Sequence, residues 1–432
     1  MPAPAPAGIS YNSFSKEERV AFENLLEGFQ DALVMSRNVS IYNTDQTMME
    51  RTNNTIWRPQ PYISRSFEGT DQTSNFSQYT QLAVPSQIGF NRSVPWIMTA
   101  TELRDALQEQ RLGNAAKQKL ASDINVQVLN VASSLGSLVV KRTTAATGYD
   151  DVAQCEAIFN EQGVQFEDRY LALSTRDYNG MASNLASRQT LAGKALKGYE
   201  KSYVGEVASF GTYKLDYANR IGAASGGAIT IDTRDSASNY WVPKSVTTSP
   251  STSERLNVDN RFQTITVSQT TYVQPGDAFT IATVEAVHHI TKQSTGQLKT
   301  FRVVEVVDGT HLKITPPIIS NQVDASASSE YQNCVVNTKA SNSAIVWLNT
   351  AASYINCFWQ KDAIEILPGR YAVPSDAGVN VIRASTDQGI ELVMQKFYDI
   401  NTMKIKYRLD TLFGVVNKQP EMSGIILFNQ SA

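Results

Sequence analysis

The chain has 432 residues, which is too long for one ordinary hydrophobic core, so we expect two or three domains or one domain with large insertions. Its formal net charge is −3, whereas proteins that bind nucleic acid tightly carry a strongly basic domain. Hydrophobic residues make up 42% of the chain, which is enough for packed cores. The composition therefore predicts a globular protein and argues against tight DNA binding and against polybasic attachment to a membrane.

The N-terminal residues MPAPAPAG lack the charged and apolar regions of a signal peptide, and no run of eighteen apolar residues occurs. We expect neither secretion by a signal peptide nor a membrane span, and the alternating Pro and Ala predict a short extended tail. The three cysteines form no C-x-x-C pair, which predicts buried thiols in a reducing cytoplasm instead of disulfides or a zinc knuckle.

Residues 15–35, SKEERVAFENLLEGFQDALVM, predict an amphipathic helix. Ser15 and Glu18 have the spacing of a capping box, in which each side chain bonds the backbone N–H of the other residue. Apolar side chains recur on one face: Phe22, Leu25, Leu26, Phe29 and Leu33. This stripe needs a partner, either the rest of the same chain, which we favour, or a partner subunit or assembly factor.

Residues 36–98 show little periodicity and mix Asn, Thr, Ser, Gln and Pro with isolated aromatic residues. A loop of this length is either functional or disordered. Disordered segments are poor in aromatic residues, but this one contains Trp57, Tyr62, Phe67, Phe76 and Tyr79. We therefore expect an extended functional loop.

Residues 99–137 carry the strongest local signal. Thr99 and Glu102 have capping-box spacing, and one helix face is apolar at Ala116, Leu120, Ile124, Val128, Val131 and Leu135. A helix of roughly 35 residues is about 50 Å long, so it predicts a strut along an elongated or flat molecule. A sustained coiled coil is the rival interpretation, but the stripe is not a clean heptad, and Gly113 and Asn114 interrupt it.

Residues 140–221 predict an α+β body, with helices at 149–162 and 181–201 and a β segment around 202–215. Two stretches poor in hydrophobic residues, 222–228 and 324–344, predict linkers.

Between these linkers lie only short strand signals: AITI, YWVP, RFQTITVS, AFTIATVEAV, FRVVEV and HLKITPP. Asp308-Gly309 marks a hairpin turn. Six short strands without a helix predict a small closed β-barrel, because closure removes the exposed edges that promote aggregation. The barrel is then an insertion that splits the body, which resumes with a helix-then-strand pattern at 345–367 and two or three strands at 390–428.

The chain offers no recognisable catalytic constellation. His288, His289 and His311 all lie in the predicted barrel, and neighbours along a strand point to opposite faces, so we expect structural roles for them. A Ser-His-Asp or Cys-His arrangement on the body would lack its base, and no phosphate-binding motif is present. Carboxylate pairs such as Asp150 and Asp151 are typical of solvated surfaces. We expect no enzymatic activity, no cofactor and no metal.

Several segments resemble the major coat protein of short-tailed, headful-packaging phages of the P-twenty-two type. The resemblance rests on NNTIWRPQ, ELRDA, ASSLGSLVV, NVDNRF, FRVVEVVDGTHLKITP and YRLDTLFGVVNKQPEMSGIIL. It covers roughly residues 50–140, 220–320 and 400–430. It implies an α+β, HK-ninety-seven-like capsid fold with a long spine helix, an extended E-loop and an inserted small antiparallel β-barrel, the I-domain.

The resemblance also implies a division of the chain into the named regions of that fold. These are an N-terminal arm (1–50), the E-loop (51–98), the spine helix with some of the P-domain (99–150), a first A-domain segment (151–222), the insertion barrel (223–345), a second A-domain segment (346–400) and C-terminal P-domain strands (401–432).

By the same resemblance, copies of the chain form hexamers and pentamers and build an icosahedral procapsid in the host cytoplasm with scaffolding and portal proteins. The virion shell then expands around packaged double-stranded DNA, which it encloses non-specifically, and no membrane takes part. A net charge of −3 suits a container that must not adhere to its polyanionic cargo.

The predicted subunit contacts lie in three loops. In the E-loop they are Trp57, Arg58, Phe67 and Phe76, because buried aromatic residues commonly anchor interfaces, although Trp57 could equally pack inside its own subunit. In the barrel, the loops 245–257 and 288–300 match family loops that reach a neighbouring capsomer and that are tied to shell size. Their charged residues are Glu254, Arg255, Lys292 and Lys299. The first loop is less charged than in the family, and exposed ion pairs contribute only about 0–1 kcal/mol.

Two other classes of protein remain open at this point. A phage tail or receptor-binding protein shares the richness in Ser, Thr, Asn and short strands, but it predicts a trimeric β-rich shaft. A hydrolase acting on surface polysaccharide would need a functional carboxylate pair.

Overall fold

The computed structural model describes residues 16–32, 34–42, 55–60, 66–76, 80–99, 102, 106–186, 204–231, 240–320, 327, 329–336, 343–371, 380–386 and 388–431. The chain divides into two compact units. The first comprises Met1–Ile56, Ser86–Val128 and Ile366–Val416, and the second comprises Trp57–Pro85, Leu129–Glu365 and Asn417–Ala432.

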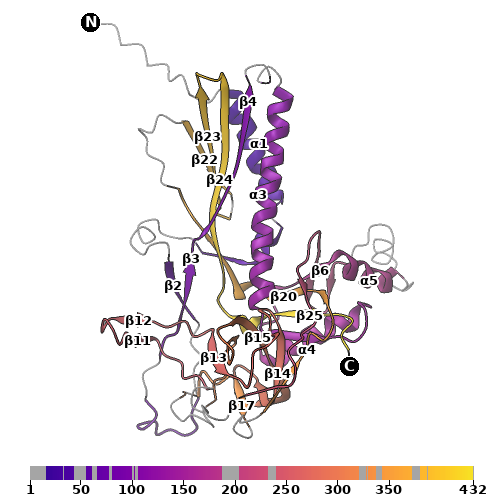
Figure 1. The fold of residues 1–432 in the computed structure, drawn as a ribbon, viewed down its shortest axis with the longest axis vertical. Helices are drawn as coiled ribbons and strands as arrows, with labels where there is room; N and C mark the ends of the chain where they lie inside the picture. Colours follow the sequence, from indigo (N-terminus) through magenta and orange to yellow (C-terminus); the bar gives the residue numbers. More distant parts are fainter. Residues whose placement is uncertain are drawn as a thin grey trace. The chain divides into compact units, whose positions relative to one another are not determined.

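A six-stranded sheet organises the first unit (Figure 1). Its order is β1 (Ser40–Ile41), β21 (Ile364–Pro368), β24 (Lys404–Asn417), β23 (Glu391–Asp399) and β22 (Asn380–Ser385), and β4 (Phe90–Thr99) also pairs with β24. The β4–β24 ladder is antiparallel and runs from Phe90 opposite Phe413 to Thr99 opposite Lys404.

Helix α1 (Lys16–Ala32) packs inside the first unit, as we favoured. Phe22, Leu25 and Phe29 are buried, and Glu18 accepts hydrogen bonds from Lys396 Nζ of β23 at 2.5 Å and from the Tyr407 hydroxyl of β24 at 3.2 Å. Ser15 of the predicted capping box and Leu33 of the predicted stripe lie outside the described residues. The apolar stripe of this helix therefore serves its own chain.

Helix α3 (Ala106–Leu135) confirms the long helix, contributing its residues up to Val128 to the first unit and the rest to the second. Ala116, Leu120, Ile124 and Val128 are buried on one face, as predicted. Val131 and Leu135, predicted on the same face, are only partly buried, and Leu129 and Ala132 are the buried hydrophobic residues in that part of the helix. The predicted reciprocal bonds are also present: Glu102 Oε2 accepts from Thr99 N at 2.7 Å, and Thr99 Oγ1 accepts from Glu102 N at 3.4 Å.

A second six-stranded sheet organises the body of the second unit. Its order is β5 (Leu138–Lys141), β25 (Ser423–Leu427), β20 (Asn356–Gln360), β6 (Arg169–Ser174), β8 (Phe210–Leu215) and β7 (Glu206–Val207). Helices α4 (Tyr149–Gln162) and α5 (Thr175–Ala186) contribute to its core, where Phe159, Phe210 and Phe358 meet with ring centroids 5.1–6.3 Å apart.

The inserted segment forms the predicted small barrel (Figure 1). Its strands run β10 (Ile229–Thr230), β18 (Ala344–Trp347), β14 (Ala278–Val287), β15 (Ser294–Val306), β16 (His311–Thr315) and β13 (Gln263–Thr266), and β17 (Cys334–Val336) adds to β14. A bridge between Ile231 and Val267 closes the circle, and Asp308-Gly309 forms the predicted turn between β15 and β16. The interior is filled by side chains such as Phe279, Phe301 and Ile314.

Five predictions need correction. Asp151 was predicted on a solvated surface, but its side chain is buried and accepts from Arg142 Nε and Thr147 N, both at 2.7 Å. Residues 240–243, predicted as a strand, form none. Strand β17 and the start of β18 lie inside the stretch predicted as the second linker. Residues 345–367, predicted as a helix followed by a strand, fold into strands with no α-helix. The last is β4, which falls in the segment predicted as an irregular extended loop. It pairs only with β24 among the described strands, and such an edge strand tolerates Pro95. The predicted helix 181–201 is observed as α5 up to Ala186, and 187–203 lie outside the described residues.

Two further results concern the described residues. Their helices include none that is both long and apolar enough to cross a membrane. Cys155, Cys334 and Cys357 are free and buried, as predicted, and burial raises the pKa of each thiol, to about 12 for Cys334 and Cys357.

Candidate functional site

The histidines do not converge on a metal or a nucleophile. His288 Nδ1 accepts from two backbone N–H groups of its own turn, and the ring packs against Gly163 at the end of α4. His311 lies on the exposed turn and bonds Asp308 at 2.8 Å. Burial lowers the pKa of His289 to about 4, so its imidazole is neutral at pH 7. Across the described part of the chain, no three His, Cys, Asp or Glu residues are grouped to hold a metal ion.

The two legs of the extended loop pair as β2 (Thr55–Pro59) and β3 (Ala83–Gln87). Trp57 is half-buried on β2. Arg58 bonds Glu365 through Nη2 at 3.1 Å and Nε at 3.5 Å, and the Glu365 side chain is only 2% exposed. Lys418 Nζ lies 3.0 Å from Oε2 of the same carboxylate. The structure therefore gives Arg58 a partner inside its own chain, and its predicted contact with another subunit remains a prediction.

The distal stretch of this loop, residues 66–76, presents two large apolar side chains to solvent. Phe67 is 47% exposed and Phe76 is 88% exposed, the highest value among the large hydrophobic residues that the structure describes. The turn between them is held by its own polar groups: Gln72 Nε2 donates to Gly69 O at 2.7 Å, and Asp71 accepts from the Thr73 backbone and hydroxyl. A preformed turn of this kind loses little conformational freedom on binding.

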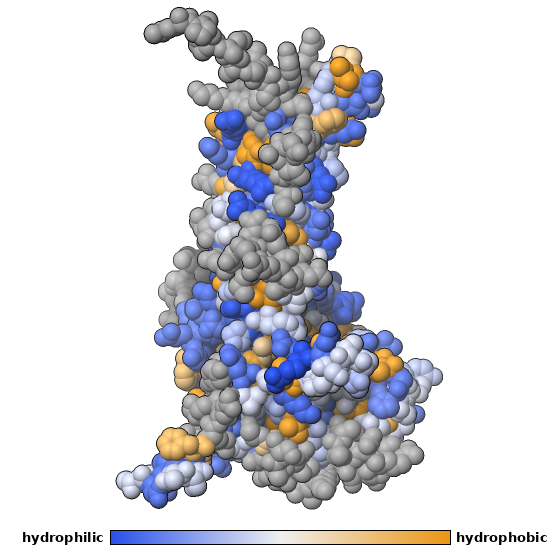
Figure 2. All heavy atoms as spheres, turned by 90° about the vertical axis from the view of Figure 1, so that its left-hand side faces the viewer, coloured by the Kyte–Doolittle hydropathy of each residue, from blue (hydrophilic) through white to orange (hydrophobic). Residues whose placement is uncertain are grey.

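The hairpin β11 (Val246–Thr248) and β12 (Arg255–Asn257) carries the predicted residues Glu254 and Arg255, and both are exposed. Leu256, the residue after Arg255, is 48% exposed. The hairpin thus offers one apolar side chain with a few charges. On the face seen in Figure 2, hydrophobic side chains likewise lie in small groups among polar ones.

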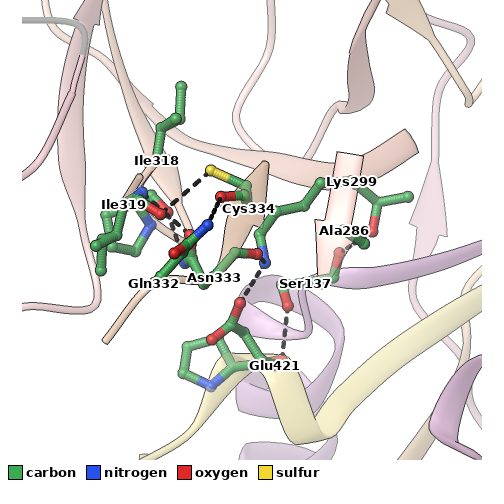
Figure 3. Close-up of polar contacts among 12 residues, drawn as sticks. Ser137, Ala286, Lys299, Ile318, Ile319, Gln332, Asn333, Cys334 and Glu421 are labelled. Carbon is green, nitrogen blue, oxygen red and sulfur yellow. Dashed lines mark hydrogen bonds and ion pairs between the residues drawn. The ribbon is translucent and has the colours of Figure 1, made fainter. Parts of the chain in front are cut away.

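The loop 288–300 is tied to the body of the second unit (Figure 3). Lys299 is 5% exposed, pairs with the carboxylate of Glu421 and donates to Asn333 O at 2.9 Å. Lys292 Nζ donates to Gln332 O at 3.0 Å, and burial lowers its pKa to about 8. Burial alone would raise the pKa of Glu421, but the neighbouring Lys299, His289 and Lys292 hold it below its usual range. Lys299 therefore has a role inside the chain, and its predicted subunit contact is untested.

Three residues that join segments far apart in the chain were not among the predicted site residues: Glu365, Lys418 and Arg261. Arg261 forms a fork with Asp259 and donates from Nη1 to Asn417 O at 2.8 Å. Arg261 and Lys418 lie in NVDNRF and YRLDTLFGVVNKQPEMSGIIL, two segments that carry the family resemblance, but a single sequence does not show which distant residue a polar side chain will meet.

Comparison with known proteins assigns the family. Residues 11–429 match the family described as "P22 coat protein - gene protein 5". The chain belongs to the P22 coat protein family. This membership confirms the predicted fold class and decides between the three functional classes considered above: the protein is a major capsid protein that forms the shell of a phage head.

Solved structures similar to this coat protein include phage capsids. One titled "Mycobacterium phage Che8" is 8% identical, with 92% of each chain covered and a TM-score of 0.44. Another, "Asymmetric unit of bacteriophage PhiM1 mature capsid", is 9% identical, covering 100% of this chain and 92% of that one, with a TM-score of 0.43. The "CUS-3 coat protein I-domain" is 38% identical over 29% of this chain and 98% of its own, with a TM-score of 0.21.

Proposed function

We propose that this coat protein assembles with scaffolding and portal proteins into a procapsid in the host cytoplasm, and that the shell expands as double-stranded DNA is packaged. The family match over residues 11–429 carries the proposal. The net charge of −3 supports it, since a strongly basic shell protein would bind the polyanionic genome.

The proposal includes the division of the chain given above: arm 1–50, E-loop 51–98, spine helix and some of the P-domain 99–150, A-domain 151–222 and 346–400, barrel 223–345 and P-domain strands 401–432. It also includes a structural role without catalysis.

Contacts between copies, in hexamers and pentamers, are proposed at the exposed loop residues. Phe76 is the strongest of these because an aromatic side chain 88% exposed on a preformed turn gains the most from burial in a neighbour. Phe67, Glu254 and Arg255 are exposed as well. Trp57, Arg58 and Lys292 are partly buried and would contribute through their remaining exposed atoms.

Electron microscopy of the purified, concentrated protein, with and without its scaffolding protein, tests the proposal. Shells or polyheads are expected, whereas rods would favour a tail protein and dispersed particles an enzyme. Phe76→Ser should raise the protein concentration needed for assembly about tenfold or more, because burying an aromatic side chain contributes about 1.5–3 kcal/mol. Phe76→Leu keeps an apolar side chain, so the concentration that it needs for assembly should lie closer to that of the parent. Parent-like assembly of Phe76→Ser would contradict the proposed contact.

A further inference from the structure

The turn at the end of β24, residues 417–421, receives contacts from two regions of the second unit that are distant in sequence. From the extended loop, Gln60 Nε2 donates to Lys418 O at 3.2 Å, and Arg58 shares the carboxylate of Glu365 with Lys418. From the barrel, Arg261 Nη1 donates to Asn417 O at 2.8 Å. One short turn therefore holds the outgoing leg of the loop and the barrel together.

The returning leg of the loop is attached to the barrel directly. Ala83 forms a parallel bridge with Asp259, and the Tyr331 hydroxyl donates to Thr80 O. The two legs are joined to each other by Gln60 N, which donates to Leu82 O at 2.9 Å.

These contacts close a ring. From Gln60 it passes to Lys418 and Asn417, through Arg261 to Asp259, and through Ala83 and Leu82 back to Gln60. A small cavity of about 70 Å³ lies within it, lined by Gln60, Leu82, Asn260, Arg261, Tyr331 and Gln419 among others. In this ring Arg261 connects the barrel to the turn.

Arg261 suits this position for chemical reasons. Its guanidinium offers several donors in a planar fork, so Nε and Nη2 bind the Asp259 carboxylate at 2.9 and 2.6 Å while Nη1 remains for Asn417 O. The side chain is only 7% exposed, so water competes little for these bonds. A lysine ammonium at this site would be a single point of charge and could not span both partners in the same geometry.

We propose that Arg261 is a positioning residue that fixes the base of the extended loop, residues 57–60 and 80–85, on the inserted barrel. The barrel then sets the position from which the loop reaches a second copy of the chain. This last step rests on the proposed function, whereas the ring itself is a property of the single chain.

Hydrogen exchange on the full-length, unassembled protein tests the ring. Arg261→Lys should speed amide exchange in 57–60 and 80–85 about tenfold, since charge-assisted hydrogen bonds in a buried site are lost, while exchange in β14, β20 and β25 stays within about twofold. Arg255→Lys on the exposed hairpin of the same barrel is the matched control and should change neither region.

A second substitution checks that the contacts act as one unit. Gln60→Ala should speed exchange at 80–85 in the parent, but much less when added to Arg261→Lys, because the ring is already open. Unchanged exchange at the loop base in Arg261→Lys would overturn the proposal. A uniform rise throughout the second unit would overturn it too, since Arg261 would then be an ordinary stabilising residue.

Assembly provides the functional measurement. Arg261→Lys should yield fewer shells or a broader distribution of shell sizes at the concentration where Arg176→Lys, a change at an exposed residue of α5, assembles normally. Locally faster exchange with normal shells would overturn the link between the barrel and the loop contact. If Phe76→Ser also assembles normally, the proposed contact of the loop with a second copy is wrong. The hydrogen-exchange result then still decides whether the ring exists in the single chain.

Discussion

Removal of the Arg302 guanidinium should open the C-terminal end of α3. Arg302 lies on β15 of the barrel, is 1% exposed, and donates from Nη2 to Ser133 O at 3.0 Å and from Nη1 to Gly136 O at 3.2 Å. Carbonyl groups at the end of a helix have no partner within the helix, so a cation placed there satisfies them and complements the helix dipole. Burial lowers the pKa of Arg302 to about 10, so the group is still charged at pH 7.

The expected loss follows from these contacts. Arg302→Met removes both bonds to the helix end and a third from Nε to Gly276 O at 2.9 Å. Each hydrogen bond from a charged donor is worth about 1.5–3 kcal/mol, and the relief of burying a charge offsets some of the sum. We therefore expect a net loss of about 2–4 kcal/mol in local opening free energy. This corresponds to amide exchange in residues 129–137 that is roughly 30- to 1000-fold faster.

Hydrogen exchange followed by mass spectrometry measures this loss in the folded protein. Arg302→Lys keeps the positive charge, so its amide exchange rate in residues 129–137 should lie between those of the parent and of Arg302→Met. This variant keeps the test informative if the methionine variant does not fold. Arg255→Met on the exposed hairpin should leave the helix end unchanged. Protection of residues 129–137 within about twofold of the parent in Arg302→Met would refute the capping role.

Two other substitutions test the interior of the second unit. Between pH 4 and 6.5 the unfolded state binds a proton at His289 that the folded state rejects, so stability falls as pH drops through this window. The free energy of unfolding, measured in urea, should fall less between pH 7 and 5 in His289→Gln than in the parent, by up to about 2 kcal/mol. His311→Gln on the exposed turn should show no such difference. An unchanged pH dependence in His289→Gln would count against a buried neutral His289. Gly424→Ala should lower the free energy of unfolding, measured in urea, by about 1–3 kcal/mol. The Cβ of the new alanine would clash with Leu138 O and lie 2.5 Å from Phe358 Cζ. Gly222→Ala, with no atom within 4 Å of the new Cβ, should be neutral, and equal effects at both glycines would contradict the packing argument.

Local signals in the sequence predicted the elements well where short-range chemistry decides them. The capping residues Thr99 and Glu102, the apolar stripe of α3 and the Asp308-Gly309 turn all act over a few residues, and the structure contains all of them. The closed barrel followed from strand spacing, because six strands without a helix have few other ways to bury one face and remove their edges.

Contacts between distant segments could not be predicted in this way. Arg58 and Glu365 are 307 residues apart, and Lys299 and Glu421 are 122 apart. Lys299 was expected to lie in a loop, but β15 begins at Ser294 and directs this side chain towards Glu421 inside the chain. The family resemblance located the loop but could not reveal the pairing within it.

The positions of these pairs give the C-terminal segment a specific role. A domain inserted through two chain connections can move relative to the body unless other contacts hold it. Here Arg261 donates to Asn417 O, Lys299 pairs with Glu421, and Thr300 Oγ1 donates at 2.7 Å to Ser137 O, while Ser137 itself donates to Pro420 O at 2.8 Å. All three barrel residues are therefore linked to residues 417–421, directly or through Ser137. Because this turn follows the barrel by about 70 residues in the chain, the contacts that hold the barrel are long-range ones supplied by the C-terminal segment.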